Sequence, residues 1–377
     1  MTRRKAGAGK AAIILLLLLL LTAVAAPSAT AAEEVGRIVY LEGNVTLFQR
    51  GEEVYADMGT PVYAGDLLRT GPDGFAELEV QTGPSTIVVA EDTALHVRRQ
   101  SGRGRTETTF ELLRGDLDAV VRRLTRDEAL SVKTATVALG VRGTEFKVRT
   151  SPDDSMVVGV TEGSVQVERD REQVLAEAGN AVESVERGRL NRRTVDSQEM
   201  DAFLSGWQEA RLEAFRSGAD TFIVAYAKRY EDQRPRFDRA HRAMAAHAEE
   251  LERAAEEGSD RGRGELFRLR TEVSGPAVQL RGILPAYEHT FYRLEELAGF
   301  HDEGIGRTGI DRNLDSQEFF ARWKTQRSEE EAKLANARYL LELYRQLEER
   351  SMGGLPSGDS PLGDSPFGED GPPRPQF

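Results

Sequence analysis

The chain has 377 residues, of which 39% are hydrophobic and 30% are charged, and it contains 36 glycines and 14 prolines. This composition excludes a wholly unstructured protein and leaves room for two domains of ordinary size, each with its own core. The sequence has no cysteine, which excludes disulfides, thiolate metal sites and a cysteine nucleophile.

The net charge is strongly negative. The chain has 50 basic and 63 acidic residues, a formal charge of −13. Residues 1–32 hold four of the basic residues and no acidic one, so the rest of the chain has 46 basic and 63 acidic residues, a net charge of −17. Such a surface repels phosphate backbones and anionic lipid, so we expect no nucleic-acid partner.

Residues 1–32 have the three parts of a secretory signal peptide. A basic stretch at residues 3–10 precedes an apolar run at residues 11–26, and small residues then lead to Ala29-Thr30-Ala31, an A-x-A cleavage pattern. As a helix the apolar run would be about 24 Å long, short of a bilayer core of about 30 Å. We predict cleavage near Ala31 and an extracytoplasmic location. The alternative is that the segment stays uncleaved as a membrane anchor.

Residues 33–195 predict an all-β domain. The pattern has a period of two, as at residues 75–80, where apolar residues at 76, 78 and 80 alternate with glutamates. Pro72-Asp73-Gly74 is a turn sequence, because proline fixes φ and glycine tolerates the left-handed conformation. Gly-x-Val/Leu fragments recur at Gly43, Gly115 and Gly163, but their unequal spacing argues against a fixed-period repeat.

Residues 196–350 change to a helical period and predict a bundle or hairpin of helices. Asp196 with Glu199 forms a capping box, and the same pattern recurs at Asp315 with Glu318. Between these starts we expect Pro235 to restart the first helix, and breaks at Gly275-Pro276 and at Pro285.

A heptad seam is also present in this half, at Phe237, His241, Met244, Ala248, Leu251 and Ala255. It predicts packing within the bundle, or a coiled coil that joins this chain to another one. Residues 351–377 hold six prolines and six glycines and predict a disordered tail, because they cannot bury enough apolar surface to offset their ordering entropy.

Five fragments of the β half occur in an order and spacing that resemble the FecR-type periplasmic domain, over about residues 35–185. They are residues 65–71 (GDLLRTG), 113–115 (LRG), 134–146 (TATVALGVRGTEF), 160–165 (VTEGSV) and 176–179 (AEAG). The motif residues, which we expect to be mainly structural, are Gly65, Asp66, Thr70, Gly115, Arg142, Gly143, Thr144, Phe146, Glu162, Gly163, Val165 and Gly179.

The resemblance implies a β-rich, twisted roll or solenoid-like fold without catalysis. The best-known members are single-pass regulators whose cytoplasmic segment engages an extracytoplasmic-function sigma factor, and whose periplasmic part receives a signal from an outer-membrane receptor. Here only ten residues precede the apolar run, too few for a sigma-binding segment, and a helical half follows the β domain. We therefore predict a non-enzymatic periplasmic protein that binds, scaffolds or senses a signal.

Two alternatives remain open. One is a membrane-anchored regulator of sigma-factor signalling, which requires residues 11–26 to be retained. The other is a cell-wall glycan-binding protein that uses exposed aromatics, with Trp207 and Trp323 as the candidates, although both also fit a helix core. The partner is then an envelope protein or a cell-wall component, with self-association through the helical domain as a further option, and with membrane contact only through an uncleaved N-terminal segment.

Two motif corners have both a functional and a structural interpretation. Gly65, Asp66 and Thr70 form a ligand corner or, as we favour, a turn in which the aspartate caps backbone N–H groups. Arg142-Gly143-Thr144 forms an anion site or, as we favour, a tight turn in which Arg142 pairs with a carboxylate.

Metal, cofactor and catalytic sites are not predicted. Asp311, Asn313 and Asp315 have the D-x-N-x-D spacing of a calcium loop, but Ser316 and Arg322 stand where such a loop requires glycine and glutamate. His241 and His247 are six residues apart and point to different sides of a helix, whereas His96, His289 and His301 are isolated. No G-x-S-x-G, Walker A or G-x-G-x-x-G motif precedes a suitable helix.

Overall fold

The computed structural model describes residues 33–83, 85–102, 104–122, 124–185, 188–257 and 262–351. The expected signal peptide lies outside the described residues, and so does the expected disordered tail apart from its first residue, Ser351.

Residues 34–194 form two nine-stranded sheets that pack face to face. Their strands are β1 (Glu34–Glu42), β2 (Val45–Gln49), β3 (Glu52–Tyr55), β4 (Pro61–Tyr63), β5 (Leu67–Thr70), β6 (Phe75–Val80), β7 (Ser85–Val89), β8 (Ala94–Gly102), β9 (Arg105–Arg114), β10 (Leu117–Val121), β11 (Glu128–Lys133), β12 (Ala138–Val141), β13 (Thr144–Thr150), β14 (Met156–Glu162), β15 (Ser164–Arg169), β16 (Glu172–Glu177), β17 (Asn180–Ser184) and β18 (Leu190–Thr194).

The first sheet has the order β18-β17-β14-β13-β10-β7-β6-β1-β4, and the second has the order β16-β15-β12-β11-β9-β8-β5-β2-β3. The earliest strands lie at one end of both sheets and the latest at the other, so the chain advances along the sandwich as it passes between the sheets. This arrangement confirms the expected solenoid-like β fold. Neighbouring strands are antiparallel apart from the parallel pair β9–β11.

The alternating pattern places one side chain in two in the core between the sheets. Ala76, Leu78 and Val80 are buried there as expected, and so are the large side chains of Phe110 and Phe146. A sandwich of this size buries enough apolar surface to be the main source of stability in this half.

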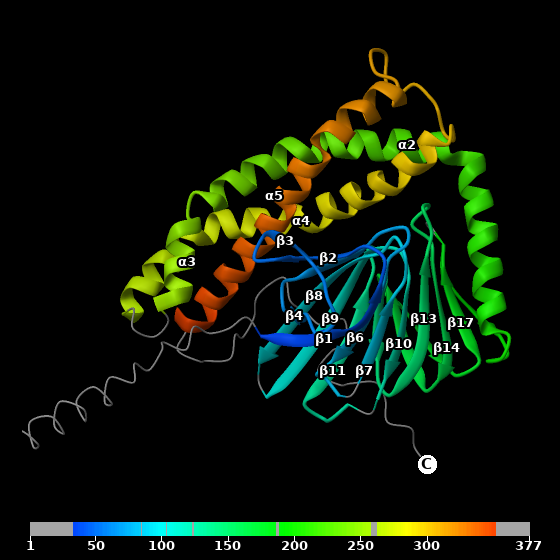
Figure 1. Ribbon diagram of the computed structural model, residues 1–377, viewed down its shortest axis with the longest axis horizontal. Coiled ribbons are helices and arrows are strands. Elements are labelled where there is room, and N and C mark those ends of the chain that lie inside the picture. Colours follow the sequence, from blue (N-terminus) through cyan, green and yellow to red (C-terminus); the bar gives the residue numbers. More distant parts are fainter. Residues whose placement is uncertain are drawn as a thin grey trace, which may run out of the picture.

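The helices are α2 (Met200–Ala245), α3 (Ala248–Glu257), α4 (Arg263–Asp302) and α5 (Ser316–Ser351). The first part of α2 packs on the outer face of the first sheet, where Met200, Leu204 and Trp207 contact Val157 and Ala181. In Figure 1 this part stands alongside β17, and α2 then turns to run with α4 and α5. Gly218 has non-helical dihedrals at this bend (φ −126°, ψ 15°).

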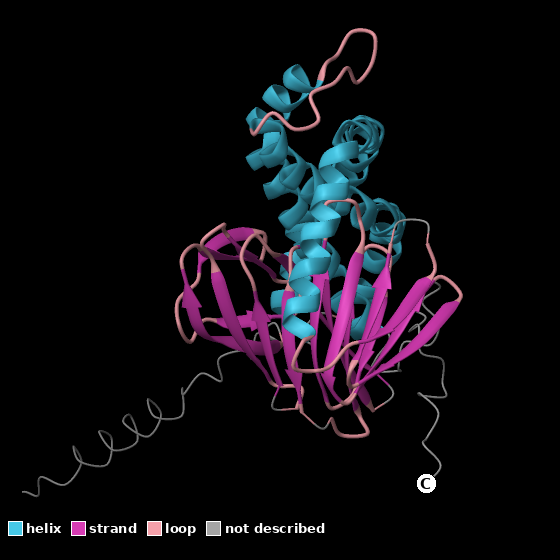
Figure 2. Cartoon of the chain, turned by 90° about the vertical axis from the view of Figure 1, so that its right-hand side faces the viewer, coloured by secondary structure: helices cyan, strands magenta, loops and turns pink. Residues whose placement is uncertain are grey.

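The rest of α2 forms a bundle with α3, α4 and α5. Its apolar core also takes in Phe48, Leu67 and Ala94 from the outer face of the second sheet. In Figure 2 most of the helices lie above the strands, and one helix runs down in front of them. The helical half is therefore fastened to both sheets rather than joined to them by a free linker. The seam residues Phe237, Met244 and Leu251 are buried in this bundle.

The expected helix breaks at proline are wrong. Pro235 lies inside α2, and Pro276 and Pro285 lie inside α4. A proline in a helix interior costs about 3 kcal/mol in an isolated peptide. The helical segments on both sides of each proline bury apolar side chains in the bundle. This tertiary packing outweighs the local cost of the proline. The bend occurs instead at Gly218, where the packing partner of α2 changes from the first sheet to the bundle.

The two expected helix starts have different outcomes. Asp315 caps α5 as predicted, since its Oδ1 accepts a hydrogen bond from the Glu318 N–H at 2.8 Å. Asp196 instead accepts from the Gln198 N–H at 2.9 Å and forms a separate turn, and α2 begins only at Met200. Among the helices described, none has the combination of length and apolarity needed to cross a bilayer.

Candidate functional site

Several of the motif glycines stand where the backbone requires them. Gly115 has a φ of 91°, and a Cβ there would lie 2.2 Å from the Thr93 hydroxyl. Gly163 has a φ of 77°, and its Cβ would lie 2.3 Å from the Gly143 carbonyl oxygen. Gly65, Gly143 and Gly179 also have positive φ values. These positions form turns of the sandwich.

Asp66 and Thr70 bond to the surrounding backbone. Oδ2 of Asp66 accepts hydrogen bonds from the Tyr63 N–H and from Nε2 of Gln49, both at 2.8 Å, and burial raises the pKa of this carboxyl to about 7. The Thr70 hydroxyl donates to the Ala90 carbonyl oxygen at 2.6 Å and accepts from the Thr93 N–H at 2.9 Å. This geometry favours the turn over the ligand corner.

The remaining motif residues also serve the sandwich, with the exception of two exposed side chains. The Thr144 hydroxyl donates to the Ser164 carbonyl oxygen at 2.8 Å, and Phe146 and Val165 are fully buried. Glu162 is exposed. Arg142 is exposed too and makes no ion pair with the residues that the structure describes, so its expected carboxylate partner is wrong.

The 311–315 loop does not gather ligands. Asp311 accepts from the Asn313 N–H at 2.7 Å, and Asp315 is used by the α5 cap. Within the described ranges, no group of three or more histidine, aspartate and glutamate side chains could hold a metal ion. His241 bonds to Asn336, and His301 bonds to Ser316.

Charged residues gather where the second sheet meets the bundle. Arg69 on β5 lies 3.0 Å from Glu295 on α4 and also pairs with Glu331 on α5. Arg114, at the end of β9, lies 3.6 Å from the second carboxylate oxygen of Glu295. Arg327 on α5 also contacts Glu295. Two sheet arginines therefore bind a pair of helix carboxylates that are largely withdrawn from water.

A second group lies on the same face, between β8, β9 and the helices. Glu111 bonds to His96 at 3.1 Å and to Arg98 at 2.7 Å. On the helix side, Oε1 of Glu288 lies 2.5 Å from Nε of Arg338, and these side chains are only 4% and 3% exposed. Burial raises the pKa of Glu288 to about 7 despite the neighbouring arginine. Burial, with Arg338 nearby, lowers the pKa of His96 to about 4, so this imidazole is neutral at pH 7.

The turn between β13 and β14, residues 151–155, inserts between α2 and α4; we call it the docking turn. Oδ1 of Asp154 lies 3.1 Å from both His289 and Arg293, and its other oxygen accepts from the Tyr226 hydroxyl. Burial would raise the pKa of Asp154, but Arg293 and His289 outweigh it and hold that pKa below its usual range. Asp154 has a φ of 62°, a strained backbone for a residue with a side chain.

Asp153, its neighbour in the docking turn, pairs with Arg211 on α2. A cavity of about 20 Å³, large enough for one water, is lined by this turn, by residues 134–136 and by α4. The docking turn thus combines strain, buried charge and contacts to two helices. These are features of a site under a functional constraint.

Sequence reasoning missed these three groups, because acidic residues are too abundant for any pair to stand out. Two signals were present. Glu288 and Glu295 are seven residues apart, two turns of one helix face, with the apolar Phe291 and Leu294 between them. Asp153 and Asp154 occupy a tight turn between two strands whose other residues are mostly buried.

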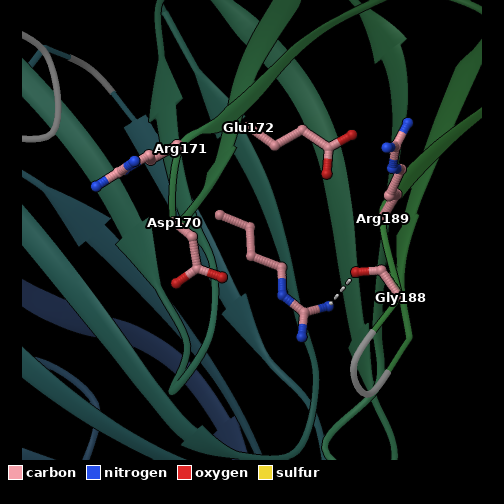
Figure 3. Close-up of a pocket in the computed structure, with 6 residues that line it drawn as sticks. Asp170, Arg171, Glu172, Gly188 and Arg189 are labelled. Carbon is pink, nitrogen blue, oxygen red and sulfur yellow. Dashed lines mark hydrogen bonds between the residues drawn. The ribbon is translucent and has the colours of Figure 1, made fainter.

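A larger pocket lies elsewhere, between the tips of the β15–β16 and β17–β18 hairpins (Figure 3). It has a volume of about 510 Å³ and is lined by Arg169, Asp170, Arg171, Glu172, Gly188 and Arg189. Arg169 donates to the carbonyl oxygens of Val185 and Gly188, at 2.7 and 3.1 Å, and to the Ser184 hydroxyl. Through these bonds, all made by one nitrogen of its guanidinium, Arg169 joins the two hairpins.

Comparison with known proteins supports the resemblance seen in the motifs. The model of the FecR protein family matches residues 66–166. No curated protein matches the sequence. Two crystal structures of a candidate anti-sigma factor from Parabacteroides distasonis are similar to 37% of this chain, with 17% identity and a TM-score of 0.32 in each case. The chain covers 65% and 64% of those two chains, slightly less than two thirds of their length.

Proposed function

Starting from the FecR-type module in its β half, we propose that this protein is an exported, non-enzymatic signalling component that binds an envelope partner in the periplasm. The family match over residues 66–166 supports a role in signalling regulation. The proposal goes beyond this match in three respects: export, the periplasmic location and the binding or scaffolding role. The observation that carries the proposal is the charged contact between the FecR-type sandwich and the helices.

This contact is of a kind that a partner can alter. Ion pairs withdrawn from water cost desolvation energy that their attraction only partly repays, so they add specificity more than stability. A domain contact made by Arg69, Arg114, Glu295 and Glu331 therefore has a defined geometry but a modest net free energy. Relative motion across such a contact is a usual means of transmitting a signal.

Cell fractionation with intact-mass measurement tests export. We expect the protein in the periplasmic fraction, with a mass that corresponds to removal of residues up to about Ala31. A full-length mass in the membrane fraction would instead support the anchored sigma-factor regulator. The glycan-binding alternative loses its candidate platform, because Trp207 and Trp323 are 8% and 2% exposed.

Photo-crosslinking in cells tests partner binding. A crosslinking amino acid at Tyr55, which is 77% exposed on β3, is compared with one at Leu175, which is 41% exposed on β16 at the other end of the sandwich. Recovery of one defined envelope protein supports the proposal. Recovery of no protein from either position would contradict it.

A further inference from the structure

The part of the second sheet that the helices cover has a small excess of basic side chains on its outer face. Along β5, β8 and β9 it presents the arginines Arg69, Arg98 and Arg114 and the carboxylates Glu107 and Glu111. His96 on this face is neutral at pH 7. Apolar side chains lie beside these charges, namely Phe48, Leu67, Ala94 and Leu113. The face therefore combines a small basic excess with an apolar centre.

The helices that cover this face carry the complementary pattern. The carboxylates that face the sheet are Glu288 and Glu295 on α4 and Glu331 and Glu342 on α5, with Arg327 and Arg338 as the cations. Of these, Glu295 and Glu331 bind the sheet arginines directly. The side chains of Glu288 and Tyr292 on α4 are buried. The sheet is thus covered by two helices, α5 and the amphipathic α4, whose Glu288 and Glu295 lie two turns apart.

The connection to the rest of the chain allows this cover to move. The first part of α2 packs on the first sheet through Met200, Leu204 and Trp207, and the bundle core begins at Phe215, just before the bend at Gly218. A Cβ at Gly218 would meet no atom within 4 Å, although Phe215 and Ala219 on either side of it are buried in the bundle core. Beyond the bend, the contacts between bundle and sandwich include the face described above, the docking turn at Asp154 and the approach of Asn336 on α5 to Gly51 in the β2–β3 turn.

We propose that the outer face of the second sheet is a protein-binding surface for an acidic amphipathic helix of a partner, and that the chain's own α4 occupies it as an intramolecular competitor. Binding of the partner helix displaces the bundle about Gly218. This inference rests on the proposed binding role and adds to it the surface, the class of partner and an autoinhibited state.

The test uses the purified mature chain and a synthetic peptide of residues 280–302, which carries the α4 face in trans. Because the sequence has no cysteine, cysteines introduced at Glu79 and Gln279 accept spin labels without background, and their separation reports whether the bundle is docked. Glu295→Lys places a cation against Arg69, Arg114 and Arg327, and so repels the bundle but leaves the sheet face intact. Glu272→Lys, on an exposed position of the same helix, is the matched control.

We expect Glu295→Lys to lengthen the label separation and to bind the peptide at least tenfold more tightly than the wild type and the Glu272→Lys control do. A peptide with both Glu288→Gln and Glu295→Gln should lose that gain. An unchanged separation in Glu295→Lys, or equal binding of the two peptides, overturns the inference. If Glu295→Lys does not fold, Asp154→Asn, which weakens the docking turn at constant volume, is measured with the same criteria.

The two proposals fail separately. If the peptide does not bind but an envelope partner is crosslinked in cells, the inference about this surface is rejected and the proposed function stands. If the peptide binds but the protein is recovered in the cytoplasmic fraction, the periplasmic role is rejected and the inference about the binding surface stands.

Discussion

Arg69 on β5 and Glu295 on α4 are 226 positions apart in the chain, and their side chains lie 3.0 Å apart in the structure. Glu295 also contacts Arg114 and Arg327, so one carboxylate connects two strands of the sandwich and a second helix. The side chain of Glu295 is 11% exposed, which leaves little water to replace a lost partner. The attachment of the helices to the sheet therefore depends strongly on this single residue.

Glu295→Gln should lower the free energy of unfolding by about 3 kcal/mol, because removing one partner from a buried ion pair leaves uncompensated charge. Urea unfolding measured by circular dichroism checks this. The control, Glu272→Gln on the exposed side of α4, should change stability by less than about 0.5 kcal/mol. Equal effects of the two variants would show that the contact contributes nothing.

Glu288 should make stability fall as pH rises from about 4.5 to 7. Burial raises its pKa to about 7 in the folded state, so the folded state holds a proton that the unfolded state releases in this range. The cost approaches about 3 kcal/mol when the side chain is fully ionised. Glu288→Gln should remove this part of the slope when unfolding free energy is measured against pH. Parallel curves for wild type and variant would contradict the assignment.

Asp154 should have the opposite dependence. Arg293 and His289 hold its pKa below the usual range, so its ionised form stabilises the fold above about pH 4, and this contribution is lost as pH falls further. Asp154→Asn should therefore be less stable than the wild type at pH 7, and this difference should shrink as pH falls below about 4. Asp170→Asn is the matched control, since Asp170 also has a positive φ (53°) but lies exposed at a hairpin tip. A destabilisation of Asp154→Asn that did not change with pH would contradict this account.

Gly163→Ala should test the structural role of the motif. The substitution combines a positive φ with a Cβ placed 2.3 Å from the Gly143 carbonyl oxygen, so it should cost more than about 2 kcal/mol. Gly59→Ala is the control: its φ is 86°, but no atom lies within 4 Å, so only the backbone strain of about 1 kcal/mol applies. Melting temperatures of the two variants measure the difference. Similar losses of melting temperature in the two variants would mean that the contact between a Cβ at position 163 and the Gly143 carbonyl oxygen adds no cost.

The β half was predictable because its pattern is local. The alternation at residues 75–80 follows directly from a strand with one buried face, and the glycines at 115 and 163 mark turns that tolerate no side chain. The helix breaks were not predictable in this way. Pro276 and Pro285 disfavour a helix locally, and only the burial of α4 in the bundle explains why it continues through them.

The charged contacts between the second sheet and the helices were even harder to predict from the sequence. Whether Glu295 is a solvated surface residue or a buried anchor depends on Arg69 and Arg114, which lie about two hundred residues earlier in the chain. A sequence with 63 acidic residues offers no local sign of which carboxylates have such partners. The docking turn is similar, because the left-handed backbone of Asp154 is held by Tyr226, His289 and Arg293 from distant helices.

The progression of strands along the sandwich has a consequence for how the protein is made. The strands β2, β5, β8 and β9 are synthesised first, and α4 and α5, which cover them, are synthesised last. Each early strand can pair with its neighbours as it emerges, but its outer face has no cover until more than one hundred and fifty further residues have followed. A newly made chain therefore passes through a stage in which this cationic, apolar face is bare, and chaperones have a defined surface to bind during that interval.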